Sequence, residues 1–76
     1  MFMNIKKSNI EVFVTNIQNA FQTEQIKEEI LIRYPKLKID FDLEDVDRVL
    51  RIEGVFNSIE IIRILIANNY KCEIME

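Results

Sequence analysis

Apolar residues recur along the chain with two different spacings, every second position in some stretches and every third or fourth in others. A period of two is typical of a strand with one buried face, and steps of three and four are typical of an amphipathic helix. The patterns predict strand, helix, strand, strand, helix, strand. The expected elements span about 10–15, 20–34, 37–44, 49–53, 57–68 and 70–75.

The first expected strand has apolar residues at two-residue spacing, and we expect Ile10, Val12 and Val14 to face the core. Phe13 then falls on the face that should meet solvent. At that position it would either cover a neighbouring long side chain or mark a contact surface.

The first helix is expected to begin after Asn19, because asparagine is a good N-cap, and Gln22 follows at the spacing of a capping box. It should end before Pro35, since the residue before a proline disfavours the helical region. Its expected core face consists of Thr23, Ile26, Ile30 and Tyr34.

The second helix repeats the cap spacing with Asn57 and Glu60, and Asn69 follows where a left-handed residue is expected to end it. We assign its core face to one stripe of apolar residues. The stripe consists of Ile59, Ile62, Leu65 and Ile66.

Other apolar residues of the two helices fall outside these stripes. A contiguous exposed apolar patch indicates association, whereas single exposed residues carry no such meaning. The candidate interface residues are Phe21, Ile61 and Ile64, and Ile32 also misses the core face.

The short link between the third and fourth elements predicts an antiparallel hairpin with Leu50 and Ile52 facing inward. With right-handed crossovers, the element order gives an α+β ferredoxin-like βαββαβ sandwich. We expect a four-stranded antiparallel sheet with both helices on one face. Residues 10–76 form this domain, and residues 1–9 are a leader or an extension of the first strand.

Composition narrows the classes of function. The 76 residues carry a net charge of −3, which argues against nucleic-acid binding and against an anionic membrane surface. A single cysteine excludes an internal disulfide, and no apolar run approaches the length of a membrane span. The start, M-F-M-N-I-K-K, lacks the pattern of a signal peptide, so we expect a cytoplasmic protein.

Several short stretches, in order and at consistent spacing, resemble the heavy-metal-associated (HMA) domain of copper chaperones and metal-transporting ATPases. They are V-x-V-T-N-I from Val12, Ile26 with Ile30, I-D-F-D-L-E from Ile39, L-R-I-E-G at Leu50–Gly54, and I-I-x-x-L-I-x-x-N-Y ending at Tyr70. The resemblance covers roughly residues 10–75. It implies the ferredoxin-like fold and a C-x-x-C pair that binds Cu(I) or Zn(II) before the first helix.

This chain departs from the family at that pair, because the two cysteine positions fall on Asn19 and Gln22. Neutral amide oxygens lack the charge and the softness that thiolates offer to these ions. We therefore expect no metal and no other cofactor in this loop. The amides either cap the helix or form a polar recognition loop, whose candidate residues are Asn16, Asn19, Gln22 and Tyr70.

Cys72 lies on the expected inward face of the last strand, where a free cysteine packs as a small apolar residue. The alternative is a soft-metal site that uses Cys72 with methionines. The methionines are Met1, Met3 and Met75.

Five carboxylates gather within eight residues of the hairpin. They begin like a calcium loop, but position six is Asp45 instead of glycine and position twelve is Arg51 instead of glutamate. The cluster is either a solvated face that guards a sheet edge or a docking site for a basic partner. Its members are Asp40, Asp42, Glu44, Asp45 and Asp47.

Catalysis has little support, because the chain has no histidine, no glycine-rich phosphate loop, and no serine or cysteine beside an evident base. We expect a non-catalytic module that binds a protein partner or a second copy of itself. A divergent copper or zinc protein with other ligands is the alternative. A small-molecule regulatory domain is a third possibility.

Overall fold

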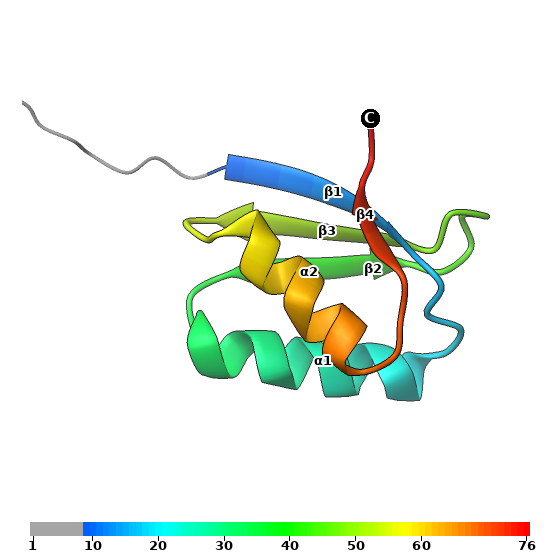
Figure 1. The fold of residues 1–76 in the computed structure, drawn as a ribbon, viewed down its shortest axis with the longest axis horizontal. Coiled ribbons are helices and arrows are strands. Elements are labelled where there is room, and N and C mark those ends of the chain that lie inside the picture. Colours follow the sequence, from blue (N-terminus) through cyan, green and yellow to red (C-terminus); the bar gives the residue numbers. More distant parts are fainter. Residues whose placement is uncertain (1–8) are drawn as a thin grey trace, which may run out of the picture.

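The computed structural model describes residues 9–76, which form four strands and two helices in the predicted order (Figure 1). The strands are β1 (Asn9–Thr15), β2 (Lys38–Asp42), β3 (Val49–Gly54) and β4 (Cys72–Ile74), and the helices are α1 (Ala20–Arg33) and α2 (Ser58–Ala67). The predicted leader lies outside the described residues, except for Asn9, which begins β1.

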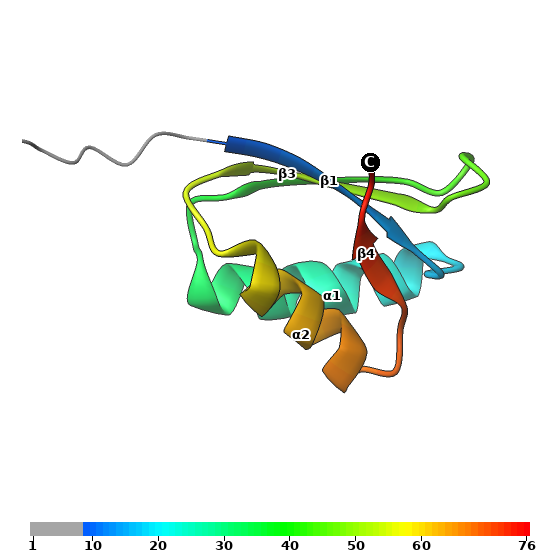
Figure 2. The same cartoon turned by 45° about the horizontal axis from the view of Figure 1, so that its top comes forward.

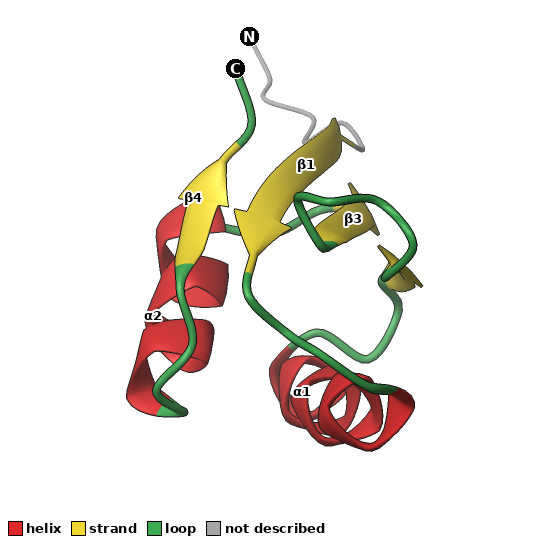
Figure 3. Cartoon of the chain, turned by 90° about the vertical axis from the view of Figure 1, so that its right-hand side faces the viewer, coloured by secondary structure: helices red, strands yellow, loops and turns green. Residues whose placement is uncertain are grey.

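All four strands join one antiparallel sheet in the order β2-β3-β1-β4, so β1 and β3 are central and β2 and β4 are the edges. Both helices cover the same face of this sheet, with α2 beneath β4 and β1 (Figures 2 and 3). The predicted ferredoxin-like βαββαβ sandwich is confirmed.

Strand β1 presents the opposite side to the helices from the one we predicted. Phe13 is fully buried and Thr15 is also buried, whereas Ile10 is 61% exposed and Val12 and Val14 are half-buried. The assignment of these three aliphatic residues to the core was wrong. Phe13 lies opposite Leu50 of β3. Burying a phenylalanine at the centre of the sheet gains more free energy than burying a valine.

Helix α2 is rotated away from the predicted core stripe. Ile61 and Ile64 are buried, whereas Ile59 and Ile66 are 58% and 57% exposed. Of the predicted stripe, Leu65 alone is fully buried. Ile61 and Ile64 therefore belong to the core, and the prediction that they form an interface was wrong.

Two polar contacts accompany this rotation of α2. The Ser58 hydroxyl donates to the Glu11 carboxylate of β1 at 3.3 Å, and the Glu60 carboxylate pairs with Arg33 of α1 at 2.8 Å. Because isoleucines lie on nearly every side of this helix, the apolar period could not select the buried side.

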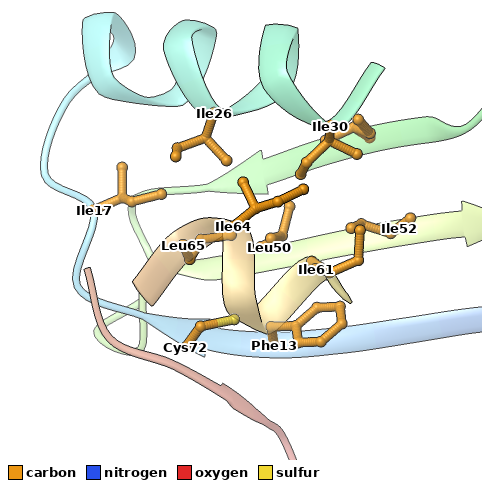
Figure 4. Packing of buried hydrophobic residues seen from close by; sticks show 11 residues of the cluster. Phe13, Ile17, Ile26, Ile30, Leu50, Ile52, Ile61, Ile64, Leu65 and Cys72 are labelled. Atoms are coloured by element: carbon orange, nitrogen blue, oxygen red, sulfur yellow. The ribbon is translucent and has the colours of Figure 1, made fainter. Parts of the chain in front are cut away.

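Of the expected core face of α1, Thr23, Ile26 and Ile30 are buried, and Tyr34 is half-buried. Ile26 and Ile30 point towards the strands that carry Leu50 and Ile52 (Figure 4). The core thus joins both helices to the central strands. Phe21 and Ile32 are largely exposed, as their positions outside the stripe predicted.

The end of α2 follows the Schellman pattern. Asn69 has φ 69°, its N–H donates to the Ile66 carbonyl at 2.9 Å, and the Tyr70 N–H donates to the Leu65 carbonyl at 3.0 Å. The left-handed conformation predicted for Asn69 is confirmed. It turns the chain back from the helix into β4.

The glycine that ends β3 has φ 143°, a conformation that side chains rarely adopt. A Cβ placed on Gly54 would also lie 2.4 Å from the side chain of Leu37. Because Gly54 has no side chain, the chain can pass close to Leu37 as it leaves the sheet towards α2.

Neither helix in the described part of the chain is long and apolar enough to cross a bilayer.

The rotation of α2 predicts unequal effects of two matched substitutions. Ile61→Ala should lower the free energy of unfolding by about 2–5 kcal/mol, because it leaves a cavity in the core. Ile59→Ala should change it by less than about 1 kcal/mol, because that side chain is mostly exposed. Urea unfolding of both variants measures the difference, and equal losses would contradict the observed rotation.

Candidate functional site

The loop between β1 and α1 is held by hydrogen bonds to two other segments, the β2–β3 turn and the residues before β4. The Thr15 hydroxyl donates to the Arg48 carbonyl at 2.6 Å and accepts from the Ile17 N–H at 3.2 Å. The Asn16 side chain accepts from the Lys71 N–H at 2.8 Å. Ile17 itself is fully buried. The loop is therefore anchored to the core and to both neighbouring segments.

Asn19 and Gln22 form the cap of α1. The Asn19 side chain accepts from the Gln22 N–H at 2.9 Å, as predicted for an N-cap. The Gln22 side chain accepts from the Gln18 N–H at 2.8 Å, one residue earlier than in a standard capping box. Both amides are thus used by the local backbone.

The structure brings the four predicted loop residues together in two pairs. Asn19 and Gln22 form the cap, while Asn16 bonds the backbone directly after Tyr70, which is half-buried against the core. The three amide side chains each accept a bond from the backbone. The structural role predicted for Asn19 and Gln22 is observed, and their role in recognition remains a prediction.

Cys72 is buried on the helix-facing side of β4, as predicted. Burial raises the pKa of its thiol to about 12, with a smaller contribution from the negative charge of Glu73. A thiol of this kind is protonated at neutral pH and is a weak metal ligand and nucleophile. Within residues 9–76, no three histidine, cysteine or acidic side chains are grouped so that they could hold a metal ion.

The acidic residues of the hairpin shape their own turn. The Asp42 carboxylate accepts from the Glu44 N–H at 3.1 Å and from the Asp45 N–H at 3.3 Å. The Asp45 carboxylate accepts from the Asp47 N–H at 2.8 Å. These are local side-chain turns that stabilise a tight connection. Asp40 lies opposite Arg51 on the neighbouring strand.

A polar cluster that we did not predict joins the C-terminal end of α1 to the start of α2. The Tyr34 hydroxyl donates to the Glu60 carboxylate and accepts from the Asn57 N–H at 3.2 Å. Arg33 donates to the same carboxylate at 2.8 Å. The Tyr34 hydrogen bond is the main cause that lowers the pKa of Glu60 and raises the pKa of Tyr34. Residues 26 positions apart give no sequence signal for this contact.

A groove of about 500 Å³ lies beside this cluster, between the α1–β2 turn and the loop after β3. Its volume is within the range of small-molecule sites. Its wall is mainly apolar, with two cationic residues at its rim. The lining residues are Arg33, Tyr34, Pro35, Lys36, Leu37, Gly54 and Val55.

The most unusual surface lies on the side of α2 that faces away from α1. Ile59 and Ile66 are more than half exposed there, and Ile62 and Ile74 of β4 are partly exposed beside them. We call these four residues the α2–β4 surface. The polar residues Glu60 and Arg63 lie on the neighbouring side of α2, next to Glu29 and Arg33 of α1.

Sequence reasoning missed this surface, because it placed Ile59 and Ile66 in the core. One signal pointed to it. Glu60, Arg63 and Ala67 form the least apolar stripe of α2, and Ile59, Ile62 and Ile66 form another stripe beside it. An amphipathic helix is expected to bury its apolar stripe and to expose its polar stripe. In the structure, both of these stripes lie at the surface.

No protein-family model matches this chain, and no curated protein or solved structure is significantly similar to it. The likeness to known proteins therefore rests on the architecture alone, which is that of a ferredoxin-like domain.

The burial of Cys72 predicts a thiol that is protected in the folded state. At pH 8 it should react much more slowly with a thiol reagent in the native protein than in denaturant, where its pKa returns to about 9. The contribution of Cys72 to stability should be constant below that pH and decrease above it, because only the unfolded state ionises readily. Absorbance of a released chromophore measures the two rates, and equal rates would contradict the burial.

The polar cluster predicts a linked titration. In the native protein the pKa of Glu60 should lie below its ordinary value, and Tyr34→Phe should raise it, because the hydroxyl is the main cause of the shift. The stabilisation from Glu60 is present above its unfolded pKa and is lost as pH falls through its folded pKa. NMR titration of the side-chain carboxyl tests this, with Tyr70→Phe as the matched control.

Proposed function

We propose that this chain is a non-catalytic protein-interaction module that contacts its partner through the α2–β4 surface. The observation that carries the proposal is the exposure of Ile59 and Ile66 on the side of α2 that points away from the core. Exposed apolar groups that are contiguous on a small domain are typical of association surfaces. Strand β4 is an edge of the sheet formed by the described residues, and its backbone groups add to the same region.

We further propose that the module is an HMA-like domain whose metal loop has become a helix cap. The ferredoxin-like topology and the hydrogen bonds of Asn19 and Gln22 support this view. The loop keeps its place between β1 and α1, while its side chains stabilise the start of the helix. In this proposal, the fold supplies a rigid support for α2 and β4.

The groove beside Tyr34 favours a second candidate function, the binding of a small apolar anion near Arg33 and Lys36. A ligand-induced rise in thermal stability that is lost in Lys36→Glu would support it. The interaction role is preferred, because the α2–β4 surface combines exposed isoleucines with an open sheet edge. A divergent metal role has no comparable support, since Cys72 is buried and its thiol is neutral.

Site-specific photocrosslinking tests the interaction role in cells that make the protein. A photoreactive phenylalanine in place of Ile66 should give a discrete adduct, because that residue lies in the α2–β4 surface. The same group in place of Ile32 is the control, since Ile32 is 79% exposed on α1. A second change, Ile59→Lys, should abolish the adduct at position 66.

Equal adducts at positions 32 and 66, or none at either, would contradict the proposed surface. The readout is the mass of each cross-linked product, so self-association and binding of another protein are both detected.

A further inference from the structure

Within residues 9–76, no strand pairs with the outer edge of β4. The Met75 N–H donates to the Val12 carbonyl at 2.8 Å, and the Lys71 N–H bonds the Asn16 side chain. Odd-numbered residues of this segment therefore direct their backbone groups towards β1. Because antiparallel ladders alternate, the N–H and C=O groups of Cys72 and Ile74 point to the open edge.

A strand from another molecule can form backbone hydrogen bonds with such an edge. The charges of the side chains in and next to β4 determine which strand pairs best. Lys71 and Glu73 both project onto the face of the sheet opposite the helices, two positions apart, and both are exposed. In an antiparallel pair, residues that lie directly opposite each other have their Cβ atoms within about 5.5 Å, so opposite charges attract there.

We propose that the partner is a second copy of this chain, with β4 antiparallel to β4 around a two-fold axis through Cys72. The proposal rests on the interaction role proposed above for the α2–β4 surface and names its partner. In this register, Lys71 of each copy faces Glu73 of the other, so the two-fold produces two charge-complementary pairs. A two-fold contact is self-complementary, as an isologous dimer requires.

Neighbouring registers that also align the outward backbone groups fit less well. An axis through Lys71 or through Glu73 places two like charges directly opposite each other, which is destabilising. An axis through Ile74 places Glu73 opposite Met75, which carries no positive charge. Charge therefore selects the axis through Cys72.

The same axis brings the two apolar surfaces together. A two-fold perpendicular to the sheet leaves both helix layers on one face, and α2 is the helix that covers the β4 side of the sheet (Figure 3). The two α2 helices then lie side by side and cover Ile59, Ile62 and Ile66 of each copy. Ile74 of one copy lies opposite Tyr70 of the other on the helix-facing side. Since β4 has only three residues, these apolar contacts supply the stabilisation that its few hydrogen bonds lack.

A charge-reversal cycle in the purified full chain tests the register. Sedimentation velocity over a range from micromolar to millimolar should show a monomer–dimer equilibrium. Lys71→Glu and Glu73→Lys should each raise the dissociation constant by about tenfold, because each replaces two attractive pairs by two repulsive ones. The double variant Lys71→Glu/Glu73→Lys should return it to within about threefold of the original value.

Glu28→Lys is the matched control, since it makes the same charge change as Glu73→Lys on an exposed position of α1 and should leave the dissociation constant unchanged. Thermal unfolding of every variant shows that the monomer still folds, so a lost dimer is not mistaken for a lost fold.

A chain that stays monomeric at every concentration overturns the dimer, and a double variant that does not recover overturns the register. If the monomeric chain still gives the position-66 adduct with another protein, the interaction role stands and self-pairing alone is wrong. If neither the dimer nor the adduct forms, both proposals are wrong.

Discussion

The burial of Phe13 at the centre of β1 is the constraint on which the rest of the structure depends. Successive side chains of a strand point to opposite faces, so placing one residue places the whole strand. With Phe13 beneath the helices, Thr15 also points inward and forms the hydrogen bond to Arg48 that holds the loop before α1. Glu11 points the same way and meets Ser58, a contact that accompanies the rotation of α2. The exposure of Ile59 and Ile66 is a distant consequence of that rotation.

The sequence predicted the architecture well, because element order depends on patterns that are repeated many times. The hairpin alternation, the cap at Asn19, the stop before Pro35 and the left-handed Asn69 each have a local physical cause. All of these predictions agree with the structure. A four-stranded sheet with two helices on one face then follows from the order of elements and the right-handed crossover.

The faces of β1 and α2 could not be predicted in the same way. In β1, both sides carry apolar residues, and counting them favoured the three aliphatic positions over the side with the aromatic ring. In α2, isoleucines on nearly every side removed the contrast that a periodicity argument needs. The contacts that α2 makes join residues far apart in the chain, such as Glu11 with Ser58 and Tyr34 with Glu60. The candidate surface was missed for this reason, while the role of the capping amides was visible because it is local.

The pairing of β1 with β4 has a further consequence for how this domain can be combined with others. The two strands are antiparallel, and Met75 bonds Val12, so the first strand begins near the end of the sheet where the last strand finishes. A folded unit with neighbouring ends can be inserted into a surface loop of another protein with little distortion of its host. The same closeness allows circular permutation: the ends can be joined by a short linker and the chain reopened at the exposed turn between β2 and β3. The domain is thus a portable unit, able to present α2 and β4 from many positions within a larger assembly.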